Sequence, residues 1–392
     1  MVSDVLSQED ELHWLALKLV PGLGTRISKR LLDRFRSPQA IFRASRSELE
    51  AAGASGALAQ SIASGCAFEE AAAQHEKVRQ TGTALIPFGD ARYPAPLREI
   101  YDPPVLLFAR GHTELLDSIM IGVVGTRRPT PYGLAVAERL SADLAHAGVT
   151  IASGMARGID TAAHKGTLAA GGNTVAVLGC GVDIVYPSEN RKLANEIIAK
   201  GLMLSEFPMG ATAFPQNFPI RNRIISGMSA GVLVVEGAQY SGSAITAKLA
   251  MDQGREVFAV PGNISSKLSW GPNLLIKQGA KLVQDWNDVI AELPAESRRH
   301  LIEQGRQRIL SSEGLETSAR DPASLLTGLG PELGPLARRT LDALSVDAAV
   351  HLDDLVENVK DTSASEVIAA LFELEMLGLV KQLPGKNFVK VW

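Results

Sequence analysis

Apolar residues in the first part of the chain recur every three or four positions, a spacing that predicts amphipathic helices. One set is Leu12, Leu15 and Leu19, and the next set begins at Ile27 and ends at Phe35. The stretch Val20–Thr25 lies between the two sets and contains a Pro and two Gly residues, which predicts a turn. Residues 1–85 are therefore predicted to form a helical module with a hairpin at its start.

From residue 104 onward, short runs of consecutive apolar residues alternate with amphipathic stretches. Strands buried on both faces have this character, as in a parallel sheet. Leu134–Ala147 and Ile245–Gln253 are the clearest helices between them. Residues 86–293 are therefore predicted to form an α/β domain with an extended Rossmann-like open sheet. The predicted strands are Ile119–Val124, Val149–Ala152, Thr174–Leu178, Leu202–Ser205, Val232–Val235, Glu256–Val260 and Lys281–Val283.

The last hundred residues divide into a polar stretch and a second compact pattern. Residues 294–334 lack a sustained apolar face and are predicted to be a linker, with one short helix around Arg298–Leu310. Residues 335–392 predict three helices followed by two strands and a turn, the outline of a winged helix. The helices are Leu336–Leu344, Leu352–Val359 and Ala364–Leu377, and the strands are Leu379–Leu383 and Phe388–Val391.

Composition narrows the class of protein. The chain has 392 residues and a formal net charge of −4, so any nucleic-acid site must be a local patch. Its two cysteines exclude a disulfide framework and a cysteine-rich zinc site. The first residues are acidic and lack the apolar stretch that a secretory signal contains. No apolar run is long enough to span a membrane. We expect a soluble cytoplasmic protein.

The common nucleotide motifs are missing. There is no phosphate-binding loop ending in Gly-Lys-Ser or Gly-Lys-Thr, and Gly179-Cys180-Gly181 lacks the third glycine of a dinucleotide fingerprint. No metal-binding His-Glu-x-x-His segment occurs. We predict no metal site, no cofactor and no catalytic residue.

Four segments at predicted strand ends carry Gly, Ser, Thr and Arg residues. In the first, Thr130 and Pro131 suit the N-cap and first turn of a helix, whose free N–H groups attract anions. In the second, Asp160 is interpreted as an N-cap, and a catalytic role for His164 is not expected. The third, Asn217–Gly227, is treated as a strand-end segment with two arginines. The candidate ligands are Gly125, Thr126, Arg127, Arg128, Gly154, Arg157, Gly158, Lys165, Arg221, Asn222, Arg223, Ser241, Gly242, Ser243 and Thr246.

The charge around these segments favours a polyanion as the ligand. Residues 221–281 contain seven basic and three acidic residues, although the whole chain is slightly acidic. No general base or metal cluster accompanies them, which favours binding over catalysis. The predicted winged helix has six basic and nine acidic residues, so we expect it to contact protein rather than duplex DNA.

Seven segments in order resemble the DNA-processing protein A (DprA/Smf) family. They are GTRRPTPYG (125–133), SGMARGID (153–160), VLGCGVDIVYPSEN (177–190), FPIRNRIISG (218–227), SGSAITA (241–247), GREVFAVPG (254–262) and GPNLLIKQGA (271–280). The helical N-terminal module, similar to SAM and helix-hairpin-helix modules, and the winged helix also fit. The resemblance implies a protein that binds single-stranded DNA, protects incoming DNA in natural transformation and loads the RecA recombinase.

The resemblance also assigns roles to residues. It implies that Arg127, Arg157, Arg221 and Arg223 contact phosphates. It also implies that five small residues allow close approach of the backbone: Gly125, Gly154, Gly158, Ser241 and Ser243. It suggests a homodimer, for which the apolar stretch around Leu274–Val283 is the candidate interface. Two alternatives remain: a Rossmann-like enzyme that binds or hydrolyses nucleotides, and a duplex-DNA regulator acting through the winged helix.

Overall fold

The computed structural model describes residues 6–239, 241–301, 303, 335–344, 349–359, 362–376, 379–383 and 386–390. Contacts divide the chain into two compact units, Met1–Ser312 and Glu313–Trp392, and each is described by itself. No helix in the described part of the chain has both the length and the apolar character needed to cross a membrane.

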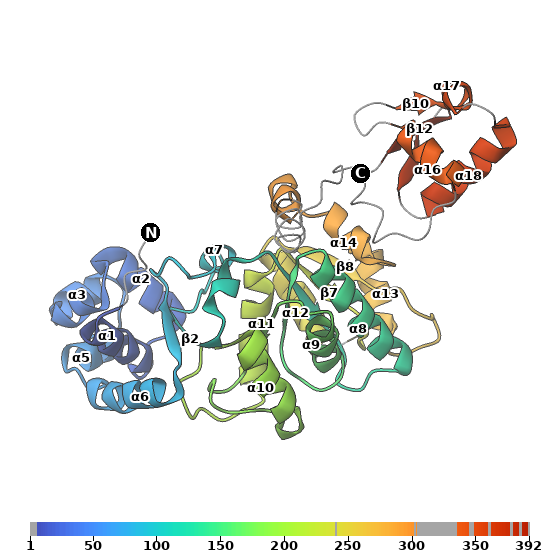
Figure 1. The fold of residues 1–392 in the computed structure, drawn as a ribbon. Helices are drawn as coiled ribbons and strands as arrows, with labels where there is room; N and C mark the ends of the chain where they lie inside the picture. Colours follow the sequence, from blue (N-terminus) through green and yellow to red (C-terminus); the bar gives the residue numbers. More distant parts are fainter. Residues whose placement is uncertain are drawn as a thin grey trace, which may run out of the picture. The chain divides into compact units, whose positions relative to one another are not determined.

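The first unit begins with six helices, which confirms the predicted helical start (Figure 1). Ser7 and Ser45 begin α1 and α4 with capping boxes, in which each serine and the acidic residue three positions later satisfy each other's backbone N–H groups. The predicted turn at Val20–Thr25 is present, and Gly22 adopts a positive φ of 78° there. The helices are α1 (Gln8–Leu19), α2 (Thr25–Phe35), α3 (Pro38–Arg43), α4 (Arg46–Ala51), α5 (Gly56–Ala63) and α6 (Phe68–Thr81).

A nine-stranded sheet forms the centre of this unit, in the order β1-β2-β6-β5-β4-β3-β7-β8-β9. All seven predicted strands are found, and they run parallel to one another. The first two strands were not predicted, and they add an antiparallel edge to β6. The strands are β1 (Ala84–Pro87), β2 (Leu106–Gly111), β3 (Met120–Val124), β4 (Thr150–Ser153), β5 (Thr174–Val177), β6 (Leu202–Ser205), β7 (Gly231–Val234), β8 (Glu256–Ala259) and β9 (Lys281–Leu282).

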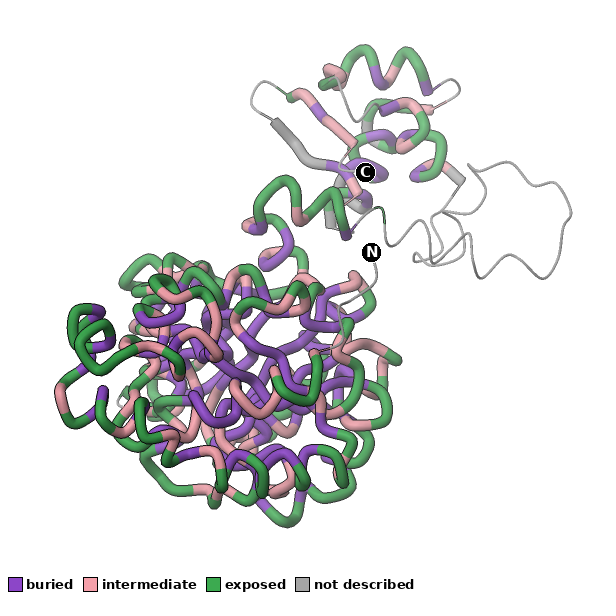
Figure 2. The backbone as a smooth tube through the Cα atoms, turned by 90° about the vertical axis from the view of Figure 1, so that its left-hand side faces the viewer, coloured by how far each residue is buried: buried purple, intermediate pink, exposed green. Residues whose placement is uncertain are grey.

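Helices cover both faces of the sheet, which confirms the open, doubly wound architecture. One face packs against α11, α12 and α13, and the other against α8, α9 and α14. In Figure 2 the buried segments run through the interior of this unit, with exposed segments around them. The helices are α7 (Ala95–Arg98), α8 (Pro131–His146), α9 (Ile159–Ala169), α10 (Arg191–Lys200), α11 (Asn217–Met228), α12 (Gly242–Asp252), α13 (Trp270–Lys277) and α14 (Trp286–Ala291), with short 3₁₀ turns at Thr113–Asp117 and Ser188–Asn190.

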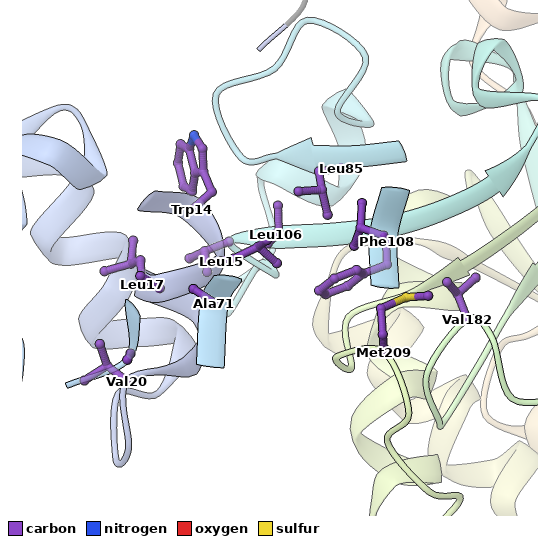
Figure 3. Close-up of a cluster of buried hydrophobic side chains, with 14 of the residues drawn as sticks. Trp14, Leu15, Leu17, Val20, Ala71, Leu85, Leu106, Phe108, Val182 and Met209 are labelled. Carbon is purple, nitrogen blue, oxygen red and sulfur yellow. The ribbon is translucent and has the colours of Figure 1, made fainter. Parts of the chain in front are cut away.

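One hydrophobic cluster joins the N-terminal helices to the antiparallel edge of the sheet (Figure 3). Leu15 of α1 and Phe108 of β2 are both fully buried in it, together with Met209. At about 25 cal/mol for each Å² of apolar surface removed from water, such side chains contribute about 1.5–3 kcal/mol each. The first helices and the sheet are therefore parts of one packed body.

The second unit has the predicted winged-helix outline. Its core contains Leu355, Leu371 and Phe388, and its three strands pair in the order β10-β12-β11. The two-residue strand β10 was not predicted. Of the predicted linker helix, residues up to 301 and residue 303 are helical, whereas residues 304–334 lie outside the described part. The elements are α16 (Pro335–Asp342), β10 (Val350–His351), α17 (Leu352–Asn358), α18 (Ala364–Met376), β11 (Val380–Leu383) and β12 (Asn387–Lys390).

Candidate functional site

A cavity of about 690 Å³ lies beyond the carboxyl ends of the central strands. The strand order reverses between β3 and β7, and such a switch point is where open α/β sheets bind ligands. The cavity gathers candidate residues from three separate segments of the chain. Those that line it are Gly125, Thr126, Arg127, Arg128, Arg221, Asn222, Ser241, Gly242, Ser243 and Thr246.

A buried carboxylate, that of Glu236, fixes the loop after β3 by hydrogen bonds. Glu236 accepts hydrogen bonds from the backbone N–H of Thr130 at 2.9 Å and from its hydroxyl at 2.6 Å. Thr130 caps α8, and Pro131 occupies the first turn, as predicted. Because the loop is fixed at this point, the exposed side chains of Arg127 and Arg128 project from a defined backbone.

Arg127 and Arg128 keep their positive charge available. Within the described residues, no carboxylate lies within ion-pair distance of either guanidinium group. The Arg127 guanidinium lies 5.1 Å from the ring centre of Phe218, which in turn contacts the ring of Tyr186. Sequence reasoning assigned no role to these aromatic residues. The sequence did contain a signal for Phe218, because this residue precedes two arginines in the segment FPIRNR and bases stack on aromatic side chains.

Arg221 enters the cavity from a helix, and the expectation of a strand-end loop over Asn217–Gly227 was wrong. The segment forms α11, which places Arg221 against the sheet with only 3% of its surface exposed. Its Nη1 donates to the carbonyl of Gly154 at 2.7 Å and to that of Val177. Burial lowers the pKa of Arg221 to about 10, so it stays protonated at neutral pH.

Gly154 makes room for this arginine. A Cβ at Gly154 would lie within 2.6 Å of the Arg221 guanidinium, so any larger residue would displace it. The glycine therefore accommodates a side chain of the protein itself. Gly242 differs, because a Cβ there would meet no atom within 4 Å and would point into open space.

Asp160 is not the N-cap that the sequence suggested. Gly158 is the N-cap residue of α9, and the Asp160 carboxylate instead accepts the backbone N–H of Ala156 at 3.4 Å from within the first turn. Asp160 is buried and lines the cavity, and burial raises its pKa to about 6, although the nearby Arg221 favours the charged form. His164, one turn later, is fully buried, and burial lowers its pKa to about 3.

The N-terminus of α12 forms another wall of the cavity. Ser241 caps this helix by accepting the backbone N–H of Ala244 at 3.3 Å, and its hydroxyl lies 2.7 Å from that of Ser243. The N–H groups of the first turn and these hydroxyls are donors that suit an anion.

Five candidate residues lie outside this cavity. Gly154 and Arg157 line a small neighbouring pocket together with Arg127 and Phe218. Arg157 already forms an ion pair with Glu189, with Nη2 to Oε2 at 2.7 Å. Gly158, with a φ of 78°, packs against the Thr126 carbonyl, and Lys165 is exposed on α9.

Arg223 is the fifth, and it is directed away from the cavity. Its Nη1 and Nη2 donate to the two oxygens of Glu206 at 2.7 and 2.8 Å, and its Nε donates to Asp102 at 3.0 Å. Both Arg223 and Glu206 are buried. A guanidinium already bound by two carboxylates has little capacity left for a phosphate.

These features suit an anionic ligand with flat groups. The cavity combines free guanidinium groups, helix N–H donors, hydroxyls and two aromatic rings. Among its lining residues Asp160 is the single carboxylate. No group of three or more His, Cys, Asp or Glu side chains in the described ranges is arranged to hold a metal ion.

Comparisons with known proteins agree with this architecture. The family model described as DNA recombination-mediator protein A matches residues 84–294, and the DprA winged helix domain model matches residues 319–386. The DNA processing protein DprA of Bacillus subtilis is 45% identical over 217 residues, 55% of this chain and 73% of that protein. Protein Smf of Synechocystis is 35% identical over 98% of this chain and 99% of its own length. The X-ray structure of DprA from Streptococcus pneumoniae has a TM-score of 0.65 and 36% identity, covering 74% of this chain and 99% of that one.

Proposed function

The chain belongs to the DNA recombination-mediator protein A family, which includes the DprA and Smf proteins, and from this we propose that it binds single-stranded DNA and delivers it to RecA. In this proposal the protein protects incoming DNA in the cytoplasm during natural transformation or recombination. The binding site is the cavity at the ends of β3, β4 and β7. The protein has no catalytic turnover of its own.

The observation that carries the proposal is the pairing of free guanidinium groups with two rings, the exposed ring of Tyr186 and the half-buried ring of Phe218. Arg127 and Arg128 supply charge for phosphates, and the N-terminus of α12 supplies N–H donors. Phe218 and Tyr186 supply surfaces on which unpaired bases can stack. A duplex hides its base faces, so stacking of this kind favours a single strand.

A homodimer is part of the proposal, through the region of Leu274–Val283. Strand β9 is the last strand of the sheet, and Leu282 on it is exposed. An unpaired edge strand with an exposed apolar residue can pair with a second copy of the chain. Leu275 of the same region packs into the core, so the contact would use β9 and its neighbours.

The direct test is binding to matched single- and double-stranded oligonucleotides over a range of salt concentrations. We expect preference for the single strand, and an affinity that falls with salt because phosphate contacts release counterions. Delivery to RecA is measured separately, as faster RecA filament formation on DNA already coated with a single-strand-binding protein. Equal affinity for both DNA forms would contradict the proposal.

One observation favours an alternative, a nucleotide-hydrolysing enzyme. Asp160 lines the cavity with a raised pKa, which is a property of catalytic acids and bases. It has no second carboxylate beside it in the lining, and hydrolysis usually needs a partner group or a metal. Steady hydrolysis of ATP or GTP that disappears in Asp160→Ala would favour the enzyme over the DNA-binding protein.

A further inference from the structure

We propose that helix α2 and Tyr101 form a second contact surface for single-stranded nucleic acid, which extends the binding path beyond the cavity. This inference rests on the function proposed for the cavity. The surface, called the α2 patch below, comprises Arg26, Lys29, Arg30, Arg34, Arg36 and Tyr101.

The α2 patch concentrates positive charge on exposed or partly exposed side chains. Five basic residues and one acidic residue, Asp33, lie between positions 26 and 36. The opposite side of α2 packs inward through Leu31 and Leu32, so helical spacing turns the basic side chains outward. Among the described residues, no carboxylate lies within ion-pair distance of any of these five cations. In a slightly acidic chain, such a cluster points to an anionic partner.

Aromatic rings are interleaved with these cations. The guanidinium of Arg26 lies 4.6 Å from the ring centre of Tyr101, and the Lys29 ammonium lies 6.0 Å from that of Phe88. Tyr101 is 72% exposed, although an aromatic ring gains by burial. A cluster of cations beside one exposed ring suits a flexible strand, whose phosphates bind the cations while a base stacks on the ring. An acidic protein surface would require the cations alone.

The α2 patch is connected to α11, the helix that carries Arg221, through the chain segment that contains residues 101 and 102. Arg221 on α11 lines the cavity, and Arg223 on α11 donates to Asp102, the residue after Tyr101. The Arg26–Tyr101 contact then connects α2 to this segment. Both surfaces therefore belong to one packed unit, and a single strand of sufficient length can contact both at once.

The test measures affinity as a function of oligonucleotide length, with the full chain and fluorescently labelled poly-dT of about 6 to 50 nucleotides. The patch variant is Arg26→Ala with Arg30→Ala, two exposed substitutions. The matched control is Lys77→Ala with Arg79→Ala, which removes the same charge from exposed positions on α6. Tyr101→Ala, compared with Tyr101→Phe, tests stacking separately.

We expect the patch variant to bind the shortest oligonucleotides normally and to lose the gain in affinity that longer ones bring. For long oligonucleotides the slope of log affinity against log salt should fall by about 1.4, since each phosphate contact on a single strand contributes about 0.7. Tyr101→Ala should weaken long-oligonucleotide binding at least about fivefold, and Tyr101→Phe should not.

The inference is wrong if the patch variant matches the Lys77/Arg79 control at every length. It is also wrong if that variant loses binding to anionic vesicles or to RecA while its oligonucleotide binding is unchanged. The cavity is tested in the same assay by Arg127→Ala, which should weaken binding at all lengths. If Arg127→Ala binds oligonucleotides of every length normally, the function proposed for the cavity is contradicted. The result for the α2 patch variant is then judged separately.

Discussion

Arg127 and Arg128 differ from the other candidate arginines in what their guanidinium groups already bind. Both are exposed and lack a carboxylate partner in the described chain, whereas Arg157, Arg221 and Arg223 are engaged within the protein. Replacing Arg127 and Arg128 by Ala should therefore weaken DNA binding, by roughly 1.5–3 kcal/mol for each charge-assisted hydrogen bond to phosphate that the substitution removes. Titration of a labelled single strand measures the effect.

The control for that double variant is its thermal unfolding. Exposed side chains without ion-pair partners contribute little to stability, so the melting temperature should stay close to that of the unchanged protein. Unchanged DNA affinity in the double variant would show that the loop after β3 is not part of the binding site.

Asp160 should make stability depend on pH. Its pKa is about 6 in the folded protein against an ordinary value of 3.8, so the folded state holds the proton more tightly than the unfolded state does. The contribution of Asp160 to the free energy of unfolding is therefore largest below about pH 4 and falls as the pH rises through 6. The expected loss is about 3 kcal/mol.

Comparison with Asp160→Asn isolates this contribution. Asparagine keeps an oxygen to accept the Ala156 N–H and does not titrate. The stability of Asp160→Asn relative to the unchanged protein should therefore rise by about 2 kcal/mol between pH 4 and pH 7, measured by urea unfolding. A constant difference across this range would mean that the carboxyl is not buried as described.

At the scale of elements, α11 is anchored by an ion pair that serves the fold. Arg223→Ala should lower the free energy of unfolding by about 3–5 kcal/mol, because it leaves Glu206 buried with its nearest remaining cation, Lys18, at 3.9 Å. Denaturant unfolding measures this, and DNA affinity of the folded fraction should change little. If Arg223→Ala is stable but cannot bind DNA, Arg223 is part of the DNA-binding site.

The elements of the sheet were largely accessible to sequence reasoning, and the positions of the arginines were not. Parallel strands are buried on both faces, so β3 to β8 appear in the sequence as short apolar runs. Strand β1 has four residues at the edge of the sheet, and β2 joins the sheet only through antiparallel pairing with β1 and β6, which the repeated strand–helix pattern does not predict. The segment around Arg221 and Arg223 reads equally as loop or helix, and only the packing of α11 reveals that one arginine faces the cavity and the other faces Glu206.

The glycines illustrate the same limit. From the sequence, Gly154 and Gly242 were both candidate DNA-binding residues, and the family resemblance gave Gly154 the role of allowing close approach of the backbone. In the folded chain the guanidinium of Arg221, which is 67 residues away in the sequence, occupies the space where a Cβ of residue 154 would lie. Gly242 instead faces open space. Local patterns cannot separate these cases, because the difference depends on a contact distant in sequence.

For the whole molecule, we expect a dimer formed through strand β9. Light scattering at micromolar concentration should give twice the chain mass, and Leu282→Asp should give a monomer by placing a charge in the contact. Ile264→Asp, at a fully exposed position outside β9, is the control. A monomeric mass for the unchanged protein would exclude the dimer, and a dimer that survives Leu282→Asp would place its interface elsewhere.

The fixed position of Arg221 has a consequence for the rate of binding. Its guanidinium is held by the Gly154 and Val177 carbonyls before any ligand arrives, so this part of the cavity requires no ordering step when DNA enters. Association should then be limited by diffusion and steered by charge, with rate constants that decrease as salt is added. Differences in affinity between DNA sequences would consequently appear in how long each strand stays bound.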